Sequence, residues 1–254
     1  KAMSDAIRIH DLSTLSAAGR HALLARTEAD LGPFLDAVRP IVAAVKAEGD
    51  EAVARFTRDF DKATVSADSL RVGQDALDAA PGLLEPEVMA AIDFAADSIR
   101  RFHEAQQGEP ITMETSPGVV CERHFRPIEA VGLYVPAGVA PLPSAAIMLA
   151  VPARIAGCKT RIICTPPRKD GTADPAVLTV ANLCGVARVF KVGGAQAIAA
   201  MAYGTEIVPK VDKVFGPGNA WVTAAKLLVA NDPDGAALDL PAGPSEVLVI
   251  ADET

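Results

Sequence analysis

Residues 131–165 read VGLYVPAGVAPLPSAAIMLAVPARIAGCKTRIICT, and this stretch predicts the fold. It contains two short apolar runs, at 131–135 and 161–165, on either side of an Ala-rich run over 144–156. Short apolar runs bounded by turn residues are typical of buried strands, and a longer apolar run between them is typical of a helix. The stretch therefore predicts a strand–helix–strand unit with two parallel strands.

The same alternation continues toward the C-terminus. Further strands are predicted over 189–192, 213–215 and 247–251. Further helices are predicted over 175–184, 195–202 and 220–229. Repeated strand–helix units favour an α/β fold class with a parallel sheet, which binds its ligand at the carboxyl ends of its strands.

The N-terminal part has a helical pattern instead. Over 33–60, apolar residues recur at three- and four-residue steps, and a Gly-Asp pair at 49–50 divides the run into a predicted helix–turn–helix pair. Another helix is predicted after Pro86. Residues 111–124 predict an extended hairpin, while the pattern over 66–80 does not decide between helix and strand.

Composition limits the classes of partner. With 24 basic and 32 acidic side chains, the 254-residue chain has a net charge of −8, which argues against a nucleic-acid or anionic-membrane partner. The longest apolar stretch, 145–153, is too short to cross a bilayer, and no signal peptide is visible. We expect a globular protein of the cytoplasm.

The cysteines and histidines show no metal-binding spacing. The cysteines are Cys121, Cys158, Cys164 and Cys184, and the histidines are His10, His21, His103 and His124. No C-x-x-C or H-E-x-x-H pattern occurs, so the residues predict free, buried thiols and no self-contained zinc cluster.

Four Gly-containing loops stand where predicted strands end or begin, at 134–138, 192–196, 215–219 and 241–246. Glycines let backbone N–H groups approach a ligand, and two of the loops open a helix, whose N-terminus favours an anion. The amides of Gln196 and Asn219 could bind ribose hydroxyls or a base edge.

Plainer interpretations of these loops stay open. Any single loop also fits a tight turn, Asn219 alone fits a helix cap, and Tyr134 fits the edge of a core. Ser245 has no spaced His and Asp partners, which favours a turn or ligand-binding hydroxyl over a nucleophile. The sequence contains neither G-x-G-x-x-G after a strand nor a P-loop.

In this order, the loops resemble those of the histidinol dehydrogenase family. The segments that carry the resemblance are 132–136, 143–144, 191–196, 201–205, 210–213, 216–219 and 239–246. The resemblance implies NAD-dependent oxidation of L-histidinol to L-histidine through bound L-histidinal, in the last steps of histidine biosynthesis. It also implies a zinc cofactor and a homodimer. The implied architecture is similar to aldehyde dehydrogenases, with Rossmann-like domains that lack the glycine fingerprint.

The resemblance also assigns roles to individual residues. Tyr134, Gln196 and Asn219 match NAD-contacting positions of the family, and Ser245 matches a substrate-contacting position. The zinc ligands and the catalytic Glu-His pair of the family match nothing in this sequence. We therefore expect an N-terminal portion of such an enzyme, with no catalytic or metal-binding residue and no turnover of histidinol by itself.

The resemblance predicts how the chain divides. Residues 1–130 are expected to form a helical arm and the start of a first α/β domain, 131–240 a Rossmann-like domain with the cofactor loops, and 241–254 a return to the incomplete first domain. Two alternatives stay open. One is a non-catalytic ligand-binding or assembly module derived from the family, and the other is a paralogue that oxidises another polar diol, such as a sulfonated one.

Overall fold

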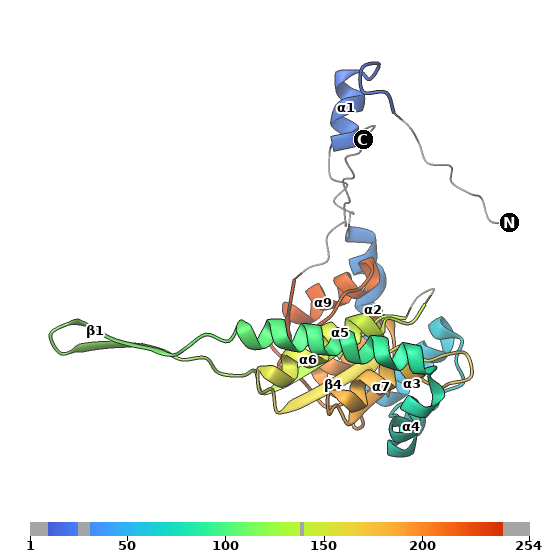
Figure 1. The fold of residues 1–254 in the computed structure, drawn as a ribbon. Helices are drawn as coiled ribbons and strands as arrows, with labels where there is room; N and C mark the ends of the chain where they lie inside the picture. Colours follow the sequence, from blue (N-terminus) through green and yellow to red (C-terminus); the bar gives the residue numbers. More distant parts are fainter. Residues whose placement is uncertain (1–9, 25–30, 138–139, 241–254) are drawn as a thin grey trace. The chain divides into compact units, whose positions relative to one another are not determined.

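The computed structural model describes residues 10–24, 31–137 and 140–240 (Figure 1). The chain divides into two compact units. The smaller unit is made of residues 1–30 and 243–254, and its described part contains helix α1 (Ala17–Leu24). The larger unit covers residues 31–242 and contains all the elements described below.

Within the described residues, five parallel strands form the central sheet. They are β3 (Ala130–Tyr134), β4 (Thr160–Thr165), β5 (Arg188–Lys191), β6 (Lys213–Phe215) and β7 (Ala237–Leu238). Their spatial order is β5-β4-β3-β6-β7, so the chain starts at the middle of the sheet, moves to one edge, and then continues on the other side of β3. The predicted parallel sheet is confirmed.

Both faces of the sheet are covered by helices. Ile162 and Cys164 belong to a hydrophobic cluster on one face, and Ile163 between them belongs to a cluster on the other. The first face packs against α2 (Gly32–Glu48), α3 (Asp50–Asp61), α8 (Gly194–Tyr203) and α9 (Ala220–Ala230). The second packs against α5 (Pro86–Ala105), α6 (Pro143–Ile155) and α7 (Pro175–Leu183). Burial on both faces explains why the strands are continuous apolar runs.

The predicted break between the two N-terminal helices lies at Gly49. Its φ is +60°, and its N–H donates to the Val45 carbonyl at 3.0 Å. The undecided stretch forms short elements, η1 (Ala67–Ser69), α4 (Gln74–Ala79) and η2 (Ala80–Leu83). Between them, the Val72 N–H donates to the Val189 carbonyl at 2.8 Å, so part of this stretch borders β5. The sequence pattern of this stretch did not decide between helix and strand because the stretch contains both short helices and a segment that borders a strand.

The predicted hairpin is confirmed as β1 (Ile111–Ser116) and β2 (Val119–Arg123), which pair antiparallel. Figure 1 shows it extending beyond the end of α5. Every residue of both strands is exposed, including the apolar Met113 and Val120. The hairpin therefore presents apolar side chains that the described part of the chain leaves uncovered.

Strand β7 was not predicted, because two residues are too few to show a periodicity. The strand predicted over 247–251 lies outside the described residues. The predicted domain boundaries near 130 and 240 stay predictions. Among the described helices, none is long and apolar enough to cross a membrane.

Candidate functional site

The carboxyl ends of β3 and β6 are adjacent at the middle of the sheet. After β3 the chain continues through α6 on one face, whereas after β6 it continues through α9 on the opposite face. This divergence marks the point at which open parallel sheets bind their ligands. The described residues of the loops after β3, β5 and β6 therefore belong to one candidate site.

Gly216, the first residue after β6, brings its loop against the end of β3. Its φ is +129°, and a Cβ there would lie 2.1 Å from the carbonyl oxygen of Tyr134, so only glycine fits. Its N–H donates to Asp239 Oδ2 at 2.8 Å, and its carbonyl accepts from Lys226 Nζ at 2.5 Å. Lys226 also pairs with Asp239 Oδ1 at 2.7 Å. This ion pair therefore holds the loop after β6 in place.

Tyr134 ends β3 and is buried. Burial raises the pKa of its phenol to about 12, so the hydroxyl is neutral at physiological pH. The hydroxyl oxygen accepts the Gly194 N–H at 3.0 Å, which ties the end of β3 to the start of α8. Tyr134 is thus part of the core edge, and its hydroxyl proton is left to donate to a ligand.

Gln196 lies in the first turn of α8 and is only 1% exposed. Neither Oε1 nor Nε2 of its carboxamide has a hydrogen-bond partner among the described residues. Leaving a buried amide unpaired costs free energy, and native structures satisfy nearly all such groups. A polar ligand at this strand end would satisfy both atoms.

Asn219 is a helix cap, which was the plain interpretation of its position. Its Oδ1 accepts the Val222 N–H at 3.2 Å and so caps α9. Asn219 is exposed, and the cap uses the side-chain oxygen Oδ1 but not the Nδ2 group. Asn219 can therefore both begin α9 and donate to a ligand at the same edge.

Two further polar groups near this edge were missed by the sequence interpretation. Thr165 ends β4, and its buried Oγ1 has no partner within the described part of the chain. Asp61 ends α3, and its Oδ2 is likewise buried and unpaired there. Burial raises the pKa of the Asp61 carboxyl to about 6. Thr165 could have been found as the last residue of a predicted strand, but Asp61 carried no sequence signal.

Comparison with known proteins identifies the family. The family model described as histidinol dehydrogenase matches residues 24–254. This chain belongs to the histidinol dehydrogenase family. Curated histidinol dehydrogenases are similar over nearly its whole length: that of Xanthomonas euvesicatoria is 54% identical over 97% of this chain, and that of Vibrio cholerae is 52% identical over 95%.

A solved histidinol dehydrogenase has the same fold. The crystal structure from Elizabethkingia anophelis is 44% identical, has a TM-score of 0.86, and is matched over 94% of this chain. The chain spans 57% and 55% of the two curated relatives and 55% of the solved chain, a little over half of each. The resemblance predicted from the loops is thus confirmed as family membership.

The described residues do not fit the zinc that the resemblance implies. No group of three or more His, Cys, Asp or Glu side chains that could hold a metal occurs in the described ranges. We therefore assign no zinc ligand and no zinc-dependent step to the residues that the structure describes. Ser245, the predicted substrate contact, lies outside the described residues.

All four cysteines of this family member are free. The prediction of buried thiols is confirmed for Cys158, Cys164 and Cys184, and burial raises the pKa of each. It is wrong for Cys121, because this residue lies in β2 of the exposed hairpin.

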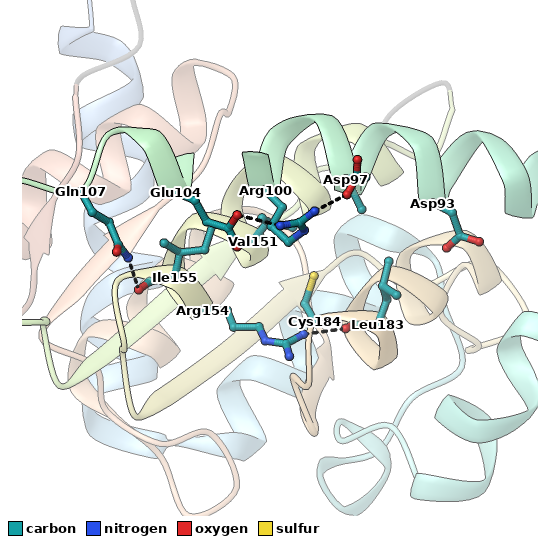
Figure 2. A pocket seen from close by; sticks show the side chains of 11 residues that line it. Asp93, Asp97, Arg100, Glu104, Gln107, Val151, Arg154, Ile155, Leu183 and Cys184 are labelled. Atoms are coloured by element: carbon teal, nitrogen blue, oxygen red, sulfur yellow. Dashed lines mark hydrogen bonds and ion pairs between the residues drawn. The ribbon is translucent and has the colours of Figure 1, made fainter. Parts of the chain in front are cut away.

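A hollow of about 730 Å³ lies between α5 and the C-terminal ends of α6 and α7 (Figure 2). Those helix ends lead into β4 and β5, so the hollow is on the side of the amino ends of the strands. Its cations have partners: Arg100 pairs with Asp97 and Glu104, and Arg154 donates to the Leu183 carbonyl at 3.2 Å. We assign no ligand to it.

Proposed function

We propose that this chain forms the NAD-binding part of a histidinol dehydrogenase, which oxidises L-histidinol to L-histidine through L-histidinal in the cytoplasm. Membership in the family supports the reaction, and the arrangement of the loops supports the cofactor. NAD supplies the oxidant when bound. The residues of this chain bind and orient it at the carboxyl edge of the sheet.

We further propose that the sheet is Rossmann-like. Counted along the chain, the spatial order of its strands is 3-2-1-4-5, which is the order of dinucleotide-binding sheets. The missing glycine fingerprint is compatible with this proposal, because Gly194 at the start of α8 and Gly216 in the loop after β6 have φ angles of +62° and +129°. An aldehyde-dehydrogenase-like arrangement of two such domains is part of the same proposal.

Each residue proposed to contact a ligand makes a different interaction. The Tyr134 hydroxyl donates to the cofactor while its oxygen holds the Gly194 N–H. The carboxamide of Gln196 donates and accepts, as a ribose diol requires, and the Asn219 amide donates from the start of α9. Ser245 is proposed to contact the substrate.

The unpaired carboxamide of Gln196 carries the proposal. It is the most deeply buried of the proposed contacts that the structure describes, and it is placed at the start of a helix, where anions and polar ligands bind. A purely structural role would leave two buried polar atoms without compensation. Binding NAD removes that cost.

Substitution of Gln196 by leucine tests this. We expect the Kd for NAD to rise at least about tenfold, equivalent to the loss of one hydrogen bond, because the apolar side chain cannot pair with the ligand. The stability of the free protein should stay the same or increase, since an unpaired buried amide is removed. Binding can be followed through the single tryptophan, Trp221, which is two residues from Asn219.

The matched control is Gln74→Leu, the same substitution at an exposed position in α4. It should leave the Kd for NAD unchanged. An unchanged Kd in Gln196→Leu as well would contradict the assignment of Gln196. Absence of NAD binding to the unsubstituted chain at millimolar concentration would contradict the proposed function.

We also propose that the protein is a homodimer and that the hairpin contributes to the interface. The exposed apolar side chains on β1 and β2 include Ile111, Met113, Val119 and Val120. Ile111 and Met113 lie on one face of the hairpin and Val120 on the other, so both faces present exposed apolar side chains of the kind that marks interaction sites. A second copy of the chain is the partner that family membership suggests.

The double substitution Met113→Glu/Val120→Glu is expected to shift the protein from dimer to monomer, because it places charges in the proposed apolar contact. Light scattering after size-exclusion chromatography would report the change relative to the 26.3 kDa of one chain. The thermal midpoint of the monomer fold should be unchanged, since both side chains are exposed. Thr112→Lys, on the same hairpin, serves as the control. A double variant that keeps the mass of a dimer would contradict the assignment of the hairpin to the dimer interface.

A further inference from the structure

Asp61 is a half-buried residue with one fully buried carboxyl oxygen, Oδ2, and its place in the fold can be traced from the other end of its helix. At the start of α3, the Asp50 carboxylate accepts from the Thr205 hydroxyl and, at 2.9 Å, from the Ile207 N–H. Both of these residues directly follow α8. The start of α3 is therefore fixed beside the end of α8.

Helices α3 and α8 are in contact with each other. Helix α3 has 12 residues and α8 has 10, so they are about 18 Å and 15 Å long. Since α3 starts where α8 ends, Asp61 at the end of α3 reaches the start of α8, at the carboxyl edge of the sheet. In agreement, the negative charge of Asp61 contributes to the raised pKa of the Tyr134 phenol, whose oxygen accepts the Gly194 N–H.

The buried oxygen of the Asp61 carboxyl has no compensating contact among the described residues. Its Oδ2 has no hydrogen-bond partner in that part of the chain. The guanidinium of Arg58, one turn earlier, donates to the Val65 carbonyl instead, and the side chain of Lys62 is exposed. A buried carboxyl oxygen without a partner costs free energy, which points to a role in binding.

In dinucleotide-binding sheets, an acidic residue binds the adenosine ribose hydroxyls of NAD, usually from the loop after the second strand. Here the second strand is β4, which ends in Thr165 and continues with two prolines. The loop that follows contains two carboxylates, and both already have partners: Asp170 accepts from Thr172, and Asp174 pairs with Arg168. The nearby carboxylate comes instead from α3, an element that precedes the sheet in the chain.

We propose that Asp61 accepts hydrogen bonds from the adenosine ribose of the dinucleotide and makes the site select NAD over NADP. In NADP, the 2′-phosphate replaces a donor hydroxyl and would bring a second negative charge beside the buried carboxylate, which costs free energy. The inference rests on the proposed function, since it requires that the site binds a dinucleotide. It adds a residue that determines cofactor choice.

Titration of the full chain with NAD and with NADP at pH 8, followed through Trp221, tests the inference. The unsubstituted chain should bind NAD at least tenfold more tightly than NADP. In Asp61→Asn this ratio should fall toward one, because NAD loses a charged acceptor and NADP loses a repulsive charge. Asp59→Asn, an exposed position on the same helix, should keep the original ratio.

A thermal melt separates this role from a structural one. Asp61→Asn should melt at the same or a higher temperature than the unsubstituted chain, because the variant buries no charge. If Asp61→Asn does not fold, Asp61→Ser provides the same test with a smaller side chain. A folded variant that keeps the preference for NAD would overturn the role of Asp61 and leave the proposed function intact. If the unsubstituted chain binds neither nucleotide, the proposed function itself fails.

Discussion

Replacing Lys226 with methionine is expected to lower the free energy of unfolding by about 3 kcal/mol, because it breaks a buried ion pair and leaves the partner charge behind. Lys226 is 3% exposed, and its ammonium contacts Asp239 Oδ1 at 2.7 Å and the Gly216 carbonyl at 2.5 Å. Methionine has a similar length but no charge and no donor. Urea unfolding followed by circular dichroism would measure the loss.

The matched control for this variant is Lys159→Met. Lys159 pairs with Glu129 at 4.0 Å on the surface, and exposed pairs contribute at most about 1 kcal/mol. The double variant Lys226→Met/Asp239→Asn should be more stable than the sum of the single effects, since no unpaired carboxylate is left. A loss under 1 kcal/mol in Lys226→Met would show that the ion pair does not hold the loop after β6.

Substitution of Gly216 by alanine is expected to lower the free energy of unfolding by about 4 kcal/mol. The added Cβ would lie 2.1 Å from the Tyr134 carbonyl oxygen, and φ at this position is +129°. The loop after β6 must move away from β3 to relieve the clash. We therefore expect the same variant to lose affinity for NAD.

Gly82→Ala is the control for Gly216→Ala. A Cβ at Gly82 would meet no atom within 4 Å, and the backbone there has no positive φ. This substitution should leave stability unchanged or improve it slightly, because alanine restricts the unfolded chain. If Gly216→Ala melts like the unsubstituted chain and binds NAD equally well, the close approach of the two loops is not required.

The elements of the sheet could be predicted from short stretches of sequence. Apolar runs of three to five residues, bounded by turn residues, predicted β3 through β6, and the Ala-rich runs that follow them predicted α6 through α9. Two candidate site residues followed from the same pattern, because Tyr134 ends a strand and Gln196 opens a helix. When a whole strand or helix is buried, most of its residues are apolar, so the element can be recognised from residues that are neighbours in the sequence.

Other parts of the site depend on contacts between residues that are far apart in the chain. Lys226 and Asp239 both bind Gly216, and Asp50 in α3 accepts from Thr205, 155 residues later. No local pattern predicts which polar residues meet in this way. For the same reason, Asp61 had no signal in the sequence.

The sequence by itself determined the α/β class, the order of strands and helices along the chain, and the glycine-containing loops at the strand ends, because hydrophobic periodicity and turn chemistry are local. The tertiary structure decided the order of strands in the sheet, the use of Asn219 as a cap, and the absence of partners for Gln196 and Asp61 among the described residues. Whether a polar atom is satisfied depends on every segment packed around it. Whether a buried polar atom has a hydrogen-bond partner is therefore decided only when the chain has folded.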